Sequence, residues 1–267
     1  MSNKLFLTKV GGGLDPDVIA FLSATGISDT TITNALNTFV LDLKANSLWA
    51  RIKFLHVYVG GTAFTHKFNL KSPLDLDTSF RLAFSGGWTH SSNGSLPNGS
   101  SGFARTFLVP STELTTTSGH LFFYSRTNSN TGSPYDMGCS DDNGVVLNTT
   151  AIITRYNSNL FYGLYGNGSY SGSVSSTDSR GGFMVNRNDG TNTTMWKNGV
   201  KVKTTTESVT LPSNGVYIGC INANGSANFF SNKEIALTSS GGGFSDAEAL
   251  IYYNSIQNFQ TALGRQV

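Results

Sequence analysis

Asn-Gly pairs recur along this chain between short runs of β-branched and aromatic residues. Such a pair between two strand-like runs is the strongest short-range mark of a β-hairpin, because both residues tolerate the positive φ angles of a two-residue turn. The pairs begin at Asn93, Asn98, Asn143, Asn167, Asn198, Asn214 and Asn224. Regular short strands without helices between them are typical of an antiparallel sandwich. From residue 51 onward the sequence therefore predicts a mainly β structure.

Two helices are predicted before the first strand. Asp15 and Pro16 suit an N-cap and a first helical residue, and Gly26 is a typical helix end. A second helix is expected from Ser28 to Asn46, with apolar residues three and four positions apart. This stripe consists of Ile32, Leu36, Phe39, Val40 and Leu43. The helical pair is too small to bury its own core, so we expect it to pack on the β domain or on a second copy.

A further helix is predicted at the end of the chain. Ser245 followed by Glu248 has the spacing of a capping box. The apolar face behind it consists of Ala249, Tyr252, Ile256, Phe259 and Leu263. We expect this face to lie against the sandwich. The chain thus divides into a flexible or partner-bound tail over residues 1–13, a helical hairpin over 14–50 and a β-sandwich over 51–267.

Composition argues against two classes of partner. Only 13% of the residues are charged, the net charge is +2 and no cluster of Lys or Arg stands out, so nucleic-acid binding is not expected. No apolar run is long enough to span a bilayer. The N-terminal segment lacks the features of a signal peptide, so synthesis in a cytoplasm is expected. Cys139 and Cys220 fit no metal motif and are predicted to be buried thiols.

Several segments together resemble one family of β-sandwiches. The run MWKNGVKVK, the strand-like VYIGCIN and the helix start FSDAE are similar to those of laminin-G-like, concanavalin A-like lectin and glucanase domains. The stretches VGGTAFTHKFNLKSPLDLD, FSGGWTHSSNGSLPNG and FQTALGR resemble such domains in structural proteins of bacterial viruses. The resemblance covers residues 15–267. It implies a concanavalin A-like jelly roll with the helical hairpin before it and the last helix behind it.

The resemblance also implies a function. The protein would be a virion structural component of a bacterial virus, such as a fibre, a spike or a capsid protrusion, made in the host cytoplasm. Its sandwich would adhere to host-surface glycans, and its N-terminal segment would attach to other virion proteins. Fibres and spikes usually have cyclic symmetry, so a homo-oligomer is expected, with a trimer favoured. A penton, decoration or baseplate component without a ligand is the alternative, and a polysaccharide-degrading enzyme is a third.

The carboxylates lack the spacing of a glycosidase. Retaining enzymes of this fold resemble one another in a Glu-x-Asp-x-x-Glu strand, which puts two carboxylates on one face about 5 Å apart. The glutamates here are widely separated, at Glu113, Glu207, Glu234 and Glu248. The histidines have no metal-ligand spacing, and they stand at His56, His66, His90 and His120. We therefore expect neither catalytic residues nor enzymatic activity.

Two loop segments carry the oxygen ligands that calcium prefers. They are Asp141, Asp142 and Asn143, and Asn188, Asp189 and Gly190. Asp and Asn also initiate turns without any metal, because their side chains bond to the nearby backbone. The turn interpretation is favoured, so neither a metal nor another cofactor is predicted.

Trp88 is the first candidate for contacting a sugar. It lies in a polar, glycine-rich stretch without a strand period, where an indole can stack on a sugar ring and donate a hydrogen bond. The other candidates are His90, Tyr135, Tyr165 and Tyr170. The alternative is that Trp88 fills the end of the sandwich or a subunit contact, because large aromatic side chains are usually buried. Trp196, in a predicted hairpin, is expected in the core.

Overall fold

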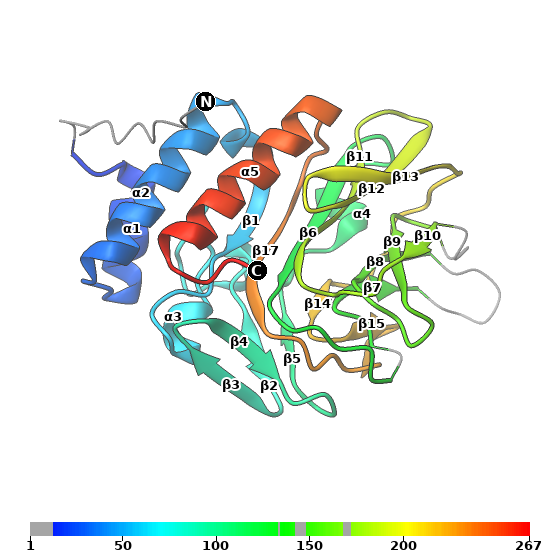
Figure 1. Cartoon of the computed structure of the whole chain (residues 1–267), viewed down its shortest axis with the longest axis horizontal. Coiled ribbons are helices and arrows are strands. Elements are labelled where there is room, and N and C mark those ends of the chain that lie inside the picture. Colours follow the sequence, from blue (N-terminus) through cyan, green and yellow to red (C-terminus); the bar gives the residue numbers. More distant parts are fainter. Residues whose placement is uncertain (1–12, 133, 142–147, 168–171) are drawn as a thin grey trace.

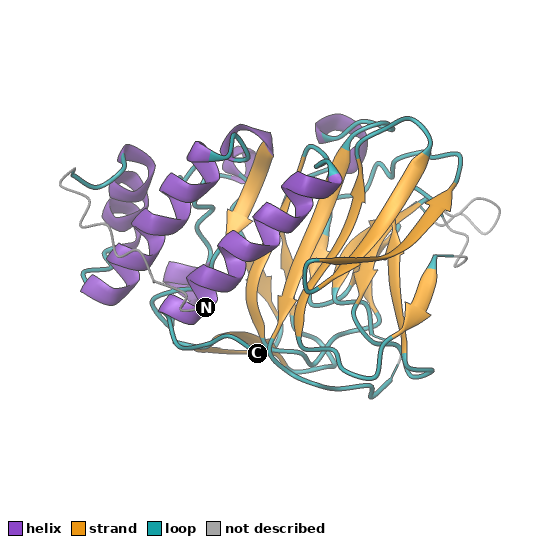
Figure 2. Ribbon diagram, turned by 45° about the horizontal axis from the view of Figure 1, so that its top comes forward, coloured by secondary structure: helices purple, strands orange, loops and turns teal. Residues whose placement is uncertain are grey.

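Two β-sheets packed face to face form the body of the molecule, and helices lie along one side of it (Figure 1). The computed structural model describes residues 13–132, 134–141, 148–167 and 172–267. Figure 2 shows the last helix lying over the strands of one sheet. The predicted fold class is confirmed: a mainly β, concanavalin A-like sandwich with a helical pair before it and a helix at its end.

Within the described residues, the first sheet has eight strands and the second has nine. From edge to edge the first contains β13 (Val200–Thr206), β12 (Asn192–Lys197), β11 (Gly181–Arg187), β6 (Gly119–Ser125), β17 (Ile235–Gly241), β4 (Gly94–Pro97) and β3 (Trp88–Ser91), with β1 (Ile52–His56) paired to β17. The second contains β10 (Ser173–Ser175), β9 (Leu160–Leu164), β8 (Thr149–Ile153), β7 (Met137–Ser140), β14 (Tyr217–Ile218), β5 (Phe103–Arg105) and β2 (Ala83–Ser85). A hairpin of β15 (Ile221–Ala223) and β16 (Ser226–Asn228) joins it, with β15 parallel to β7.

Asn-Gly turns close two of the hairpins. Asn198 and Gly199 join β12 to β13 with φ angles of 51° and 75°. Asn224 and Gly225 join β15 to β16 with φ angles of 49° and 90°. A two-residue turn with two positive φ angles matches the twist of the strands, and Asn and Gly adopt these angles at the lowest cost. The local sequence therefore sets the register of both hairpins.

Strand β6 is buried on both faces, which explains its continuous apolar run. Leu121 and Phe123 point into the core between the two sheets. Phe122 and Tyr124 point to the other side, into a core shared with the helices. A strand covered on both faces has no polar face, so it does not show the alternation of a half-exposed strand.

The long helices share one core with the outer face of the first sheet. They are α1 (Pro16–Thr25), α2 (Thr30–Ala45) and α5 (Asp246–Ala262). Phe39 of α2 stacks on Phe259 of α5 with ring centroids 4.7 Å apart, and Trp196 of β12 belongs to the same core. The helical stripe is thus covered by the rest of the chain. The division into tail, helical segment and sandwich, and the homo-oligomer, remain untested predictions.

Side chains cap the long helices where the sequence predicts. The Ser245 amide donates to Glu248 Oε2 over 2.8 Å, and the Glu248 amide donates back to Ser245 Oγ, which completes the capping box. Asp15 accepts from the Asp17 amide and pairs with Lys44 Nζ at 2.7 Å, so the start of α1 is tied to the end of α2. In the described part of the chain, no helix combines the length and the apolar character needed to cross a membrane.

The stretch around Trp88 differs from its prediction. It was expected to lack strand structure, whereas residues 88–97 form the antiparallel β3–β4 hairpin at the edge of the first sheet. The strands are short and rich in Gly and Ser, so the sequence shows no apolar alternation. Ser95 of β4 is nevertheless fully buried. Hydrogen bonds with His66 and His90 satisfy its hydroxyl there. Buried polar pairing replaces the apolar pattern here.

Candidate functional site

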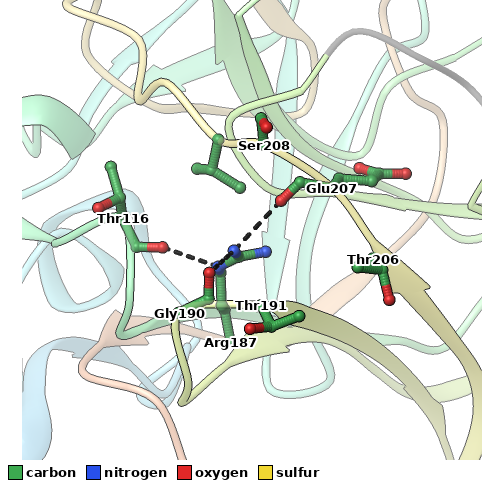
Figure 3. A pocket seen from close by; sticks show the side chains of 8 residues that line it. Thr116, Arg187, Gly190, Thr191, Thr206, Glu207 and Ser208 are labelled. Atoms are coloured by element: carbon green, nitrogen blue, oxygen red, sulfur yellow. Dashed lines mark hydrogen bonds between the residues drawn. The ribbon is translucent and has the colours of Figure 1, made fainter.

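A groove lies at one end of the sandwich, between three segments that are far apart in the sequence. They are residues 111–116 before β6, residues 187–191 after β11 and residues 206–211 after β13. One half of the groove has a volume of about 510 Å³ (Figure 3) and the other of about 410 Å³. The two halves share Thr116 and Val209, so they form one continuous depression.

The two halves differ in polarity. The residues that line the first half are mostly polar, and they include Thr116, Thr191, Thr206, Glu207 and Ser208. The second adds apolar side chains to the hydroxyls, from Leu114, Leu211 and Val209. A concave site with an apolar part and several polar groups suits a small ligand that has both hydroxyls and apolar ring faces.

Arg187 joins the three segments. This side chain is 2% exposed, and its Nε donates to the Thr116 carbonyl over 2.7 Å. Its Nη2 donates to the carbonyls of Gly190 (2.7 Å) and Glu207 (3.2 Å), as the dashed lines in Figure 3 show. Its Nη1 donates to Thr193 Oγ1 over 3.0 Å. The four hydrogen-bond acceptors of this guanidinium are neutral: three backbone carbonyls and one threonine hydroxyl. Arg187 therefore positions the groove through neutral acceptors.

Tyr165 lies beneath the second half of the groove. Its hydroxyl donates to the Thr115 carbonyl over 2.7 Å, and burial raises the pKa of the phenol, so it stays neutral. Gly119 permits this position, because a Cβ there would lie 2.0 Å from the tyrosine hydroxyl oxygen. Tyr165 thus supports the segment at residues 111–116 from below.

The Asp side chains of the two segments considered for calcium accept hydrogen bonds from backbone amides. Asp189 accepts from the amides of Asn192 and Thr191, at 2.5 and 2.7 Å, and these bonds lower the pKa of the Asp189 carboxyl. Asp141 accepts from the Ser213 and Asn214 amides, while Asp142 and Asn143 lie outside the described residues. Across the described ranges, no three His, Cys, Asp or Glu side chains gather as a metal site.

Replacing Arg187 by methionine should destabilise the protein and open the groove. Four acceptors lose their donor, one on each of the three segments and one on β12, and hydrogen bonds to a charged group contribute about 1.5–3 kcal/mol each when partners are buried. We expect a loss of about 3 kcal/mol in the free energy of unfolding, measured in urea. Arg180→Met, at an exposed arginine of the same sheet, is the control and should leave stability unchanged. Equal stability of both variants would refute the positioning role.

The structure brings together Trp88 and His90 of the predicted sugar-contacting residues and places Tyr135 and Tyr165 elsewhere. The indole nitrogen of Trp88 donates to the carbonyls of Ser85 and Phe103, at 3.0 and 3.3 Å, and the ring stacks on His90 at 6.1 Å. Tyr135 is 6% exposed and packs elsewhere, on Phe229. Tyr165 lies under the groove, and Tyr170 lies outside the described residues. Ligand binding by this set remains a prediction.

Two histidines that look unrelated in the sequence meet in the structure. His66 Nδ1 and His90 Nδ1 lie 3.0 Å apart, and both contact Ser95 Oγ, at 2.7 and 3.0 Å. Burial lowers the pKa of His66 to about 3, with smaller effects from His90 and Arg265, and burial also lowers the pKa of His90. Both rings are therefore neutral at pH 7, and they act as hydrogen-bonding partners in the packing of the β3–β4 hairpin.

Sequence reasoning missed the groove and its central arginine. Arg187 ends the run GGFMVNR, directly before the Asn-Asp-Gly turn. A guanidinium at the end of an otherwise apolar strand is a signal that could have drawn attention, because a fully buried Arg is rare unless it is well hydrogen-bonded.

No protein-family model and no curated protein matches this sequence. Solved structures of a sialidase from Trypanosoma rangeli share its fold. A mutant of that sialidase displaying trans-sialidase activity aligns with a TM-score of 0.55 and 11% identity, over 85% of this chain and 39% of that chain. The same sialidase in complex with 2,3-difluoro-KDN aligns with a TM-score of 0.53 and 12% identity, over 85% and 40%. This chain therefore spans about two fifths of the length of the sialidase chains it matches.

These neighbours contradict two expectations from the sequence. A virion structural protein without enzymatic activity was predicted, whereas the structures that share the fold are sialidases, which are glycan-processing enzymes, and they give no sign of a virus. The sequence motifs were sufficient to predict the fold. They were not sufficient to predict the function, because one fold hosts several functions. The lack of closely spaced glutamates also does not exclude glycosidase activity, because sialidases are an exception to the two-carboxylate rule.

Proposed function

We propose that this protein recognises a glycan in the groove and takes part in glycan processing. The observation that carries the proposal is the groove itself, where hydroxyl-bearing residues and the acidic residue Glu207 stand beside apolar residues. Sugars offer hydroxyls at the ring edges and apolar C–H groups on the ring faces, so both halves of the groove have a partner on such a ligand. The fold shared with sialidases supports the same ligand class.

Arg187 preorganises the groove for binding a ligand. Its hydrogen bonds hold three backbone segments before any ligand arrives, so binding does not have to order them. A preformed site loses less conformational entropy on binding than a site that must close around its ligand. Weak polar contacts to a sugar can then yield a measurable affinity.

A blocking substitution tests this proposal. Ser208 lines the first half of the groove, and Ser208→Trp should fill it and abolish retention on a glycan array, with the melting temperature nearly unchanged. Thr204→Trp, at an exposed position of β13 outside the groove, is the matched control and should bind as the wild-type protein does. Retention of the same glycans by Ser208→Trp would contradict binding in the groove.

An assay for cleavage of the retained glycan locates the processing step. Glu207 is the acidic residue among those that line the polar half of the groove, so we expect cleavage by this chain to be lost in Glu207→Gln. Cleavage that persists in Glu207→Gln would place the chemistry outside the groove. Retention of the glycan without its cleavage would mean that this chain recognises the glycan and that another protein or domain cleaves it.

A further inference from the structure

A second polar feature lies on the outer face of the second sheet, on β2, β5 and β14. The register pairs Arg105 of β5 with Ala83 on one side and Tyr217 on the other. Ala104 and Ile218 point into the core between the sheets, so Arg105 and Tyr217 point outward. Phe103, two residues before Arg105, lies on the same face and stacks on Tyr217 with ring centroids 5.1 Å apart and an interplanar angle of 23°.

Arg105 lies over this aromatic pair. Its guanidinium carbon is 5.9 Å from the centroid of Phe103 and 5.9 Å from that of Tyr217. Phe230 extends the aromatic surface, 6.5 Å from Phe103, and like Phe103 it is half-buried. A guanidinium stacked on rings loses little freedom when it binds, because the rings already restrict it.

This guanidinium has no counter-ion among the residues that the structure describes. In the described part of the chain the Arg105 side chain makes no hydrogen bond or ion pair, so its N–H donors face solvent. Arg81 provides the comparison, since it too lies over a ring, 5.7 Å from the centroid of Phe107. Asp77 and Asp75 neutralise Arg81, at 2.7 and 3.2 Å. The cation on β5 is available to an external anion, whereas Arg81 is not.

We infer that this surface binds a sugar that carries a carboxylate on its ring, of the hexuronate type. The planar carboxylate matches the fork of the Arg105 guanidinium, which can donate two parallel hydrogen bonds to it. A carboxylate attached directly to the ring leaves the apolar face of the sugar beside the accessible parts of Phe103 and Phe230. The choice of ligand rests on the proposed glycan recognition. The inference adds charge selectivity and a contact surface outside the groove.

Calorimetric titration with trigalacturonate and with its methyl ester tests the inference on the full chain. The two ligands share rings and hydroxyls and differ in charge. Arg105→Gln should weaken binding of trigalacturonate about tenfold or more, because hydrogen bonds to a charged group are lost. The ester should bind the wild-type protein no more tightly than trigalacturonate binds Arg105→Gln. Arg81→Gln removes a cation over a ring that is already neutralised, so it should leave the affinity unchanged.

Three results would overturn the inference. They are equal affinity of the wild-type protein for trigalacturonate and its ester, equal effects of Arg105→Gln and Arg81→Gln, and no binding of either ligand. The proposed groove function is tested separately by Ser208→Trp. If Ser208→Trp loses its array glycans while Arg105→Gln binds trigalacturonate as tightly as the wild-type protein does, the groove function survives and only the inference about Arg105 fails.

Discussion

Replacing Lys233 by methionine should lower the free energy of unfolding by about 3–5 kcal/mol, because it leaves the Asp136 carboxylate buried without its counter-ion. Both side chains are 0% exposed, and Lys233 Nζ lies 3.0 Å from Asp136 Oδ1. Asp136 also accepts hydrogen bonds from the Ser231 hydroxyl and from the Thr154 amide and hydroxyl. Water cannot compensate a charge at this depth. Urea denaturation followed by fluorescence measures the loss.

The double variant Asp136→Asn, Lys233→Met separates a charge effect from lost packing. Asparagine carries no charge, so the stranded anion disappears, and its single amide oxygen can still accept from the Thr154 amide and hydroxyl while its NH2 group faces the Ser231 hydroxyl oxygen. The double variant should therefore be more stable than Lys233→Met alone, since two buried partners removed together cost less than one. Additive losses from the two substitutions would show that the pair contributes by packing only.

Acidification should destabilise the protein well above the pH at which carboxylates titrate. Burial lowers the pKa of all four histidines, to about 3 for His56 and His66 and to about 4 for His120. In the unfolded chain a histidine has a pKa near 6.5, so the unfolded state binds more protons between these values. The contribution of these histidines to the free energy of unfolding is fully present above pH 6.5. It is lost as the pH falls toward their pKa values in the folded protein. Each histidine should contribute a slope of about 1.4 kcal/mol per pH unit.

Urea midpoints between pH 7 and pH 4.5 measure this slope. Asp75, Asp178, Asp189 and Glu248 also have lowered pKa values, but their stabilisation is lost at lower pH, so this window reports the histidines. His120 bonds to the Gly242 carbonyl and to Ser239 Oγ, two partners that a glutamine amide can also reach. His120→Gln should reduce the pH dependence of the free energy of unfolding by the contribution of one histidine. An unchanged slope would contradict the assignment.

The local sequence was sufficient to predict the elements whose defining contacts join residues close in the sequence. The Asn198-Gly199 hairpin and the capping box of Ser245 and Glu248 depend on residues within a few positions of one another. The helical stripe was also predictable, because its period of three and four is local. Which surface the stripe would meet was not, since periodicity does not identify a partner. Trp196 illustrates this, because it packs toward the helices and not between the sheets.

The candidate site was harder to predict than the fold. Its walls come from three segments, and the bonds that join them run from Arg187 to backbone carbonyls, which no residue pattern reveals. The contact of His66 with His90 is hidden for a similar reason, because 24 positions separate the two residues and the turn between them sets their approach. Trp88 was misplaced because its strand β3 is short and pairs with β4, whose buried residue Ser95 is polar.

Amide chemical shifts measured by NMR during titration with a neutral glycan retained on the array test the central claim most directly. Binding in the groove predicts that the perturbed amides belong to residues 111–116, 187–191 and 206–211, with the Trp88 indole signal unmoved. Perturbations centred on Trp88 and His90, with the three groove segments unchanged, would contradict the claim and restore the site expected from the sequence.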